Sequence, residues 1–163
     1  MMKRLIIFGI IVLFLINGVY ATNYYVSSSL GNDSYNGISE LTPWRTISKV
    51  NSITFSHGDN ILFKRGDIWG EQLLIRSIGT ANSYIKYSVY GAGNEAIITG
   101  NLTSKGIIFS GDYNLVSNLT IKGAGSSGIK IYDGANFNIV QYCSIHEKNW
   151  NGIEVEGDYN FIK

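Results

Sequence analysis

The sequence contains very little proline, cysteine or charge. Its 163 residues include one Pro and one Cys, and only 15% of them are charged. A single Cys excludes an internal disulfide framework and a cysteine-rich zinc site. The low charge content excludes a disordered or coiled-coil composition, and the net charge of +1 gives no electrostatic basis for binding nucleic acid. The sequence also lacks a Gly-rich phosphate-binding loop, so no organic cofactor is expected.

Glycine and asparagine are abundant instead. The chain has 19 Gly and 16 Asn, and 13% of its residues are aromatic. Gly and Asn are turn residues, so this composition predicts short strands joined by frequent corners. The length suits one domain rather than two.

One hydrophobic segment stands at the start of the chain. A basic start, Met1–Arg4, precedes an apolar run, Leu5–Ile16, and small residues at Val19 and Ala21 mark a cut before Thr22. This pattern predicts a signal peptide over residues 1–21. The alternative is an uncleaved anchor, but the run is short for a membrane span of about 20 residues. We therefore expect a secreted, periplasmic or cell-surface protein that has no membrane contact after cleavage.

The second half of the sequence is repetitive. Three similar strings begin at Gly106, Gly128 and Gly152 and read GIIFSGD, GIKIYDG and GIEVEGD. An aromatic residue followed by Asn recurs in phase with them, and a third element repeats between residues 118–122 and 142–146. The aromatic–Asn pairs are Tyr113-Asn114, Phe137-Asn138 and Tyr159-Asn160.

Within each repeat, apolar residues alternate with polar ones. A period of two indicates strands, and repeats of 22 to 24 residues with Gly and Asn at the corners predict an all-β parallel solenoid. One coil cannot bury its own apolar face, so the coils must stack. The Asn residues at 114, 138 and 160 should then form a ladder along the stack, each amide bonding to the next.

The first half should form the front of this solenoid. The string GNDSYNG over Gly31–Gly37 is expected to be a turn, although its Asn, Asp and Ser are also possible calcium ligands. Thr42 and Pro43 predict the N-cap and first residue of a short helix that covers the open end. The expected domain then runs over residues 22–163, with a cap at about 22–58 and coils at about 59–163. Since a solenoid needs a cap at each end, and no cap sequence follows Lys163, we expect the domain to be truncated there.

These strings, in this order, resemble a known family. YYVS, GNDSYNG, PWRTI, HGDNILFKRGDIW and SYIKYSVYGAGNEAIITG, followed by aromatic–Asn coils, are similar to the start of secreted right-handed parallel β-helix proteins. Within these proteins the chain resembles the pectate lyase-like group, which includes family-nine pectate lyases and alginate and chondroitin lyases. The resemblance implies a right-handed β-helix and the N-terminal part of a lyase that cleaves an acidic polysaccharide by β-elimination.

A lyase of this kind implies a calcium ion and a basic residue that removes a proton. The family's adjacent Asp pair is missing, and the nearest candidate ligands are Asp133 and Asp158 on neighbouring coils. The alternative is that Gly-Asp simply turns the chain at each corner, as expected for Asp112. The catalytic residues themselves are not identifiable, and we expect them to lie beyond Lys163.

A group of outward-facing residues is the candidate polysaccharide-binding surface. Lys130 and Glu154 should be neighbours on adjacent coils, as should Tyr132 and Glu156, and Trp150 in the corner loop at 147–151 is a candidate for stacking on a sugar. The alternatives are a solvated face with one Lys–Glu pair, or a hydrolase pair formed by Glu154 and Glu156.

The other chemically active residues have simpler interpretations. His57 and His146 are expected on the surface, and Cys143 aligns with the inward Leu119 and should be a buried apolar residue. Trp44 should belong to the core of the cap, although it and Trp69 are also candidates for stacking on sugar. Two functions remain open, a polysaccharide lyase or a non-catalytic, adhesin-like solenoid that binds glycans.

Overall fold

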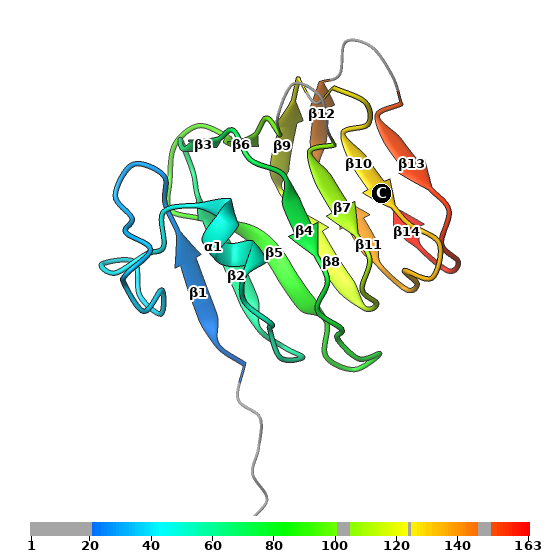
Figure 1. Ribbon diagram of the computed structural model, residues 1–163, viewed down its shortest axis with the longest axis horizontal. Helices are drawn as coiled ribbons and strands as arrows, with labels where there is room; N and C mark the ends of the chain where they lie inside the picture. Colours follow the sequence, from blue (N-terminus) through cyan, green and yellow to red (C-terminus); the bar gives the residue numbers. More distant parts are fainter. Residues whose placement is uncertain (1–20, 101–104, 124, 147–150) are drawn as a thin grey trace, which may run out of the picture.

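The computed structural model describes residues 21–163 apart from 101–104, 124 and 147–150. The chain winds into a parallel β-solenoid of about four turns built from three sheets (Figure 1). Every ladder between its strands is parallel. The fold predicted from the repeats is therefore confirmed.

The first sheet has the order β1-β2-β5-β8-β11-β14. The second sheet has the order β3-β6-β9-β12, and the third has the order β4-β7-β10-β13. From β2 onward the chain visits the first, second and third sheets in turn before it returns to the first, whereas α1 and no strand lies between β1 and β2. The strands of the first sheet are β1 (Asn23–Val26), β2 (Asn60–Lys64), β5 (Ile85–Tyr90), β8 (Asn114–Ser117), β11 (Ile139–Gln141) and β14 (Phe161–Ile162).

The strands of the other two sheets are short, as the spacing of turn residues predicts. Those of the second sheet are β3 (Ile68–Trp69), β6 (Ala96–Ile98), β9 (Leu119–Lys122) and β12 (Ser144–His146). Those of the third sheet are β4 (Leu73–Ile75), β7 (Ile107–Phe109), β10 (Ile129–Ile131) and β13 (Ile153–Val155).

The core is a set of apolar columns that run through the stack. In the third sheet, Leu73, Ile107 and Ile129 lie in register and are fully buried. The neighbouring column contains Ile75, Phe109 and Ile131, which are also fully buried. These columns have the inward phase that the alternation predicts, and they place the intervening residues on the outer face of the sheet.

The asparagine ladder forms at the predicted positions. The Asn138 side-chain oxygen accepts the backbone N–H of Asn114 at 2.9 Å, and the Asn160 oxygen accepts that of Asn138 at 2.8 Å. Asn114 and Asn138 are fully buried. The ladder therefore uses side-chain oxygens to satisfy backbone N–H groups at the corner, which removes the cost of burying those groups unpaired.

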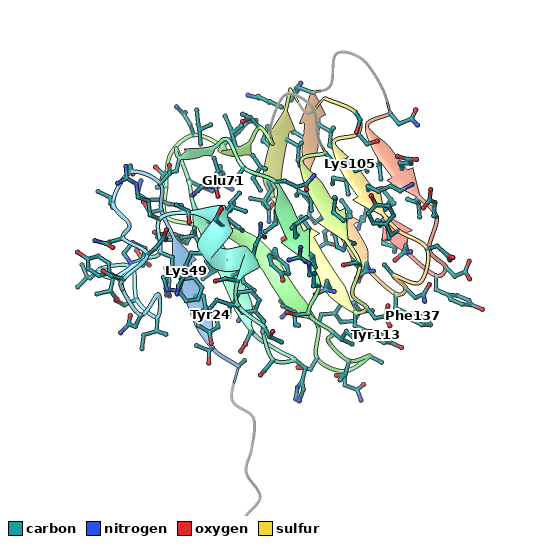
Figure 2. The ribbon with its side chains drawn as sticks, viewed as in Figure 1. Tyr24, Lys49, Glu71, Lys105, Tyr113 and Phe137 are labelled. Atoms are coloured by element: carbon teal, nitrogen blue, oxygen red, sulfur yellow. The ribbon has the colours of Figure 1, made fainter. Side chains whose placement is uncertain are left out.

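Aromatic rings stack on the outer side of the same corner. Tyr113 and Phe137 lie face to face with centroids 4.8 Å apart (Figure 2), and Phe137 stacks on Tyr159 at 5.0 Å. The aromatic–Asn pair therefore stabilises the stack in two ways. Its ring stacks on the next ring outside the coil, and its amide bonds the backbone of the neighbouring coil inside it.

A short helix, α1 (Ile47–Asn51), covers the front of the stack beside β4 (Figure 1). The predicted covering helix is confirmed, but the predicted N-cap at Thr42 is wrong. Thr46 is the N-cap, and its hydroxyl accepts the backbone N–H of Lys49 at 3.0 Å. The helix begins late because Trp44 exchanges backbone hydrogen bonds with β1, donating to Tyr25 and accepting from Ser27, which keeps residue 44 extended.

The loop over Gly31–Gly37 has the expected turn chemistry. The Asp33 carboxylate accepts the backbone N–H groups of Arg45 and Thr46 and the hydroxyl of Thr46. Burial raises the pKa of Asp33, but these hydrogen bonds outweigh burial and the net shift is downward. Asp33 therefore connects the loop to the start of α1.

Candidate functional site

The outer face of the third sheet brings together the four outward residues that the repeat predicts. Lys130 on β10 lies in register with Glu154 on β13, and Tyr132 and Glu156 directly follow these two strands. We call Lys130, Tyr132, Glu154 and Glu156, with Ser127, the β10–β13 cluster. Backbone pairing of the two strands sets their spacing, so the cluster is a direct product of the repeat.

Lys130 is the centre of the cluster. Its ammonium contacts Glu154 Oε1 at 2.8 Å, contacts Glu156 Oε1, and lies 5.4 Å from the centre of the Tyr132 ring. Only 3% of the Lys130 side chain is exposed, against 37% and 49% for the two glutamates. Lys130 therefore lies on the outer face but beneath its neighbours, and the carboxylates and the phenol ring form the accessible surface.

Glu154 is held from two sides. Its Oε1 contacts Lys130, and its Oε2 accepts the hydroxyl of Ser127 at 2.9 Å. The hydrogen bond from Lys130, followed by that from Ser127, lowers the pKa of Glu154. For Lys130, desolvation lowers the pKa, but the hydrogen bonds with Glu154 and Glu156 outweigh it and the net shift is upward.

These shifts restrict the chemistry available to the cluster. A lysine that acts as a base in β-elimination needs a lowered pKa, so Lys130 is unsuited to that step. A glycosidase acid needs a carboxyl group with a raised pKa, so Glu154 in this arrangement is unsuited to protonating a leaving group. The cluster is suited to binding, because its carboxylates accept hydrogen bonds from hydroxyl groups and 40% of Tyr132 is exposed.

Sequence reasoning missed Ser127. The signal was available, since Ser127 precedes Gly128 at the repeat position where Lys105 precedes Gly106 and Asn151 precedes Gly152. The positive charge of Lys105, which is labelled in Figure 2, also lowers the pKa of Glu154. Ser127 stands outside the strand β10, so the alternation within the strand carries no information about it.

Two of the three tryptophans proposed to stack on sugar are buried in the structure. Trp44 is buried in the cap, as expected, and stacks on Tyr24 at 5.0 Å. The prediction that Trp69 stacks on sugar is wrong, because its side chain is only 2% exposed. It packs against Phe63 and donates its indole N–H to Arg45 O. Trp150 lies outside the described residues, and its stacking function stays a prediction.

The remaining candidates occupy the expected places. His146 lies in register with Lys122, and both His57 and His146 are exposed. Cys143 is partly rather than fully buried, packs against the core, and has its pKa raised mainly by burial. Its environment is that of a structural thiol, not of a nucleophile.

The corner aspartates offer little support for bound calcium. Asp112 Oδ1 accepts the backbone N–H of Asn136 on the next coil at 2.8 Å, which is turn chemistry. Within the described part of the chain, no three His, Cys, Asp or Glu side chains gather as a metal site would require. Calcium normally takes six to eight oxygen ligands. The described residues therefore do not fit a complete calcium site, and the pair Asp133 and Asp158 stays a prediction.

Three hollows lie away from the β10–β13 cluster. A cavity of about 100 Å³ lies between α1 and the start of the third sheet, beside Leu74 and Tyr87. Shallow depressions of about 400 and 520 Å³ lie near Lys86 and near Lys122. None of these three, which are lined by described residues, contains a residue of the cluster. In the described residues, no helix is long and apolar enough to cross a membrane.

The fold places this chain in the class of parallel β-solenoids. A lacto-N-biosidase of Bifidobacterium longum subsp. longum is 36% identical over 119 residues, which is 69% of this chain but 7% of that protein. The chain thus spans a small fraction of the relative's length. No protein-family model matches the chain.

Three solved structures have similar folds. The GH136 lacto-N-biosidase of Eubacterium ramulus has a TM-score of 0.64 at 17% identity, over 83% of this chain and 30% of that one. A rhamnogalacturonan lyase has a TM-score of 0.61 at 16% identity, over 77% and 38%. An alginate lyase from Paenibacillus sp. str. FPU-7 has a TM-score of 0.52 at 19% identity, over 76% and 44%. At these sequence identities, the similarity shows a shared fold and nothing about activity.

Proposed function

We propose that this chain is part of an exported, carbohydrate-active β-solenoid protein and that the β10–β13 cluster binds a glycan. The observation that carries the proposal is the cluster itself, in which two carboxylates and a half-exposed tyrosine surround a covered ammonium. Carboxylates bond sugar hydroxyls, and aromatic rings stack on sugar faces. The predicted signal peptide supports export.

The charges of the cluster favour a neutral glycan over an acidic one. One lysine faces two glutamates, and its ammonium is already engaged by both of them. A uronate carboxylate would approach two exposed carboxylates with no free cation in the cluster to neutralise it, which is unfavourable. A neutral sugar presents hydroxyl donors that both glutamates can accept.

The comparisons support the same direction. The relative with 36% identity is a lacto-N-biosidase, and one of the similar solved structures is a lacto-N-biosidase too. We therefore propose that the whole protein cleaves glycosidic bonds in a neutral glycan. Its general acid would be a carboxyl group other than Glu154, because Lys130 and Ser127 lower the pKa of Glu154.

A polysaccharide lyase is the second candidate, and two structural neighbours favour it. Rhamnogalacturonan and alginate lyases share the fold. In that case calcium would be the cofactor, Asp133 and Asp158 would contribute ligands, and the base would be a residue other than Lys130. A binding-only solenoid requires no further residues beyond the cluster.

The test is a binding and cleavage panel on the exported protein. The probes are a neutral N-acetylated oligosaccharide with a lacto-N-biose unit, an oligogalacturonate and an alginate oligosaccharide, each with and without a chelator. The proposal predicts binding of the neutral probe that the chelator does not change. Binding of the acidic probes alone, with loss on chelation, would support the lyase, and no binding to any probe would refute the glycan site.

Variants localise the binding. Tyr132→Ala should weaken binding of the neutral probe about fivefold, since loss of an aromatic contact costs about 1 kcal/mol. Tyr35→Ala is the matched control, because Tyr35 is 43% exposed against 40% for Tyr132 but lies in the front loop. Trp150→Ala tests the stacking prediction separately. Equal losses in the Tyr132 and Tyr35 variants would contradict the location.

A further inference from the structure

A buried carboxylate lies beside the predicted cleavage point at the front of the solenoid. Asp59, in the turn before β2, is only 3% exposed. Its Oδ1 accepts the backbone N–H of Thr22 at 2.9 Å, and its Oδ2 accepts that of Ser56 at 2.8 Å. Two neutral backbone donors are therefore the hydrogen-bond partners of an enclosed carboxylate.

In the described residues, the Asp59 carboxylate has no salt bridge. Among residues 21–163, apart from the undescribed gaps, no Lys, Arg or His side chain lies within 4.0 Å of its carboxylate. The neighbouring Tyr87 phenol is buried, and its pKa is raised by burial and, second, by the charge of Asp59. A buried carboxylate is costly without a paired charge, so the site lacks a partner.

The nitrogen of Thr22 is held firmly at this carboxylate. The Thr22 carbonyl accepts the backbone N–H of Asn60 at 2.8 Å, and β1 pairs with β2 from Asn23 and Asn60 onward. The position of this nitrogen therefore depends on the β1–β2 ladder and not on the residues before it. The signal-peptide pattern independently predicts cleavage between Ala21 and Thr22.

We propose that cleavage before Thr22 creates an α-ammonium group that forms an ion pair with Asp59. A leader-cleaving peptidase would hydrolyse the Ala21–Thr22 bond with one water. The carboxylate so formed leaves with the leader, and the freed amine takes up a proton. The same nitrogen that donates one neutral hydrogen bond in the uncut chain then donates a charge-assisted one, which is stronger. Asp59 is thus the binding site in the folded domain for the N-terminal ammonium of the mature chain.

The proposal has a defined pH dependence. An α-amino group has a pKa of about 7.7–8.0 when unpaired, and Asp59 should raise it in the folded state. The added stability is therefore present below about pH 7.7 and is lost as pH rises through the raised pKa. The other titratable groups near this site are His57 in the preceding turn, and Lys86 and Tyr87 on β5. They are common to all forms compared below.

The test compares two forms of the chain that differ by one residue. One begins at Thr22, and the other begins at Ala21, which moves the ammonium away from Asp59. The Thr22 form should melt about 3 °C higher at pH 6.5, and the difference should disappear at pH 10.5. The intact mass of the exported protein should correspond to a chain that begins at Thr22.

The Asp59→Asn variant tests whether the carboxylate causes the difference between the two forms. In this background the Thr22 and Ala21 forms should melt at the same temperature, because the carboxylate is gone. If the variant does not fold, the pH dependence of the two unsubstituted forms still decides the matter. Equal melting temperatures at pH 6.5, or cleavage at another bond, would overturn the proposal without affecting the glycan site.

Discussion

Aromatic residues at the corner before β8, β11 and β14 adopt a left-handed backbone. Tyr113, Phe137 and Tyr159 have φ values of 54°, 57° and 56°. This conformation costs an L-residue about 1 kcal/mol, yet each ring gains a stacking partner on the adjacent coil. The stacking of the rings thus offsets the cost of the left-handed backbone at these corners.

A pair of substitutions at Phe137 separates these two effects. Phe137→Ala and Phe137→Gly both remove the stacked ring, but only Gly relieves the left-handed backbone. The Gly variant should therefore be more stable than the Ala variant by about 1 kcal/mol in urea unfolding. At Ile139, an ordinary strand position two residues later, the order should be reversed. Equal stabilities at Phe137 would contradict the strain.

The asparagine ladder gives a second prediction at this scale. Asn138→Ala removes the acceptor for the buried N–H of Asn114, so it should lower the free energy of unfolding by about 1–3 kcal/mol. Asn82→Ala, at an exposed turn, is the control and should change it by less than about 0.5 kcal/mol. The ladder would not be a main stabilising feature if the two variants were equally stable.

Ionisation of the β10–β13 cluster gives a third prediction. The pKa of Glu154 is lowered from its ordinary value of 4.5, so the contribution of the pair is present above that pH and is lost as pH falls through the lowered value. The pKa of Lys130 is raised above 10.5, so its contribution is present below that pH and is lost as pH rises through the raised value. Glycan affinity measured by calorimetry should thus be constant between pH 5.5 and pH 9. A bell-shaped profile in that window would indicate acid–base groups instead.

At the scale of elements, α1 replaces a strand at the front of the third sheet. The Asn51 side chain donates to Gln72 O at 2.8 Å and accepts the backbone N–H of Leu74 at 2.9 Å. One asparagine thus covers the open edge of β4, where a preceding coil would otherwise pair. Unprotected edges invite pairing with other chains, so this cap also limits aggregation.

Removal of that cap should be visible at β4. Asn51→Ala should accelerate hydrogen exchange of the Leu74 amide and lower the free energy of unfolding by about 1–3 kcal/mol. Ser52→Ala is the control, because the Ser52 hydroxyl donates its hydrogen bond to Lys49 O in the helix rather than to β4. Unchanged exchange at Leu74 in the Asn51 variant would show that the edge is protected in another way.

The sequence predicts these elements unequally. Strands of the repeat, the asparagine ladder and the pairing of Lys130 with Glu154 follow from a fixed period, which places equivalent residues side by side. The helix start at Thr46 and the burial of Trp69 depend on contacts with residues distant in the chain, β1 for the first and Phe63 for the second. A period carries no information about such contacts, so the sequence did not reveal them.

At the scale of the whole molecule, stacking separates stability from function. The inward columns of the third sheet are apolar in successive coils, whereas its outward column changes from Leu74 and Ile108 to Lys130 and Glu154. The outer face can therefore vary while the core stays constant. This is consistent with lyases and lacto-N-biosidases sharing one fold, since a site and not a fold determines activity.

The most direct test of the glycan site on the third sheet maps where a glycan binds. Amide chemical shifts would be recorded while the neutral N-acetylated oligosaccharide is added to the exported protein. If the β10–β13 cluster binds the glycan, the shifts that change gather in residues 127–132 and 152–156, and Tyr132→Ala reduces these changes. Changes confined to another face, or changes produced only by the oligogalacturonate, would contradict the glycan site on the third sheet.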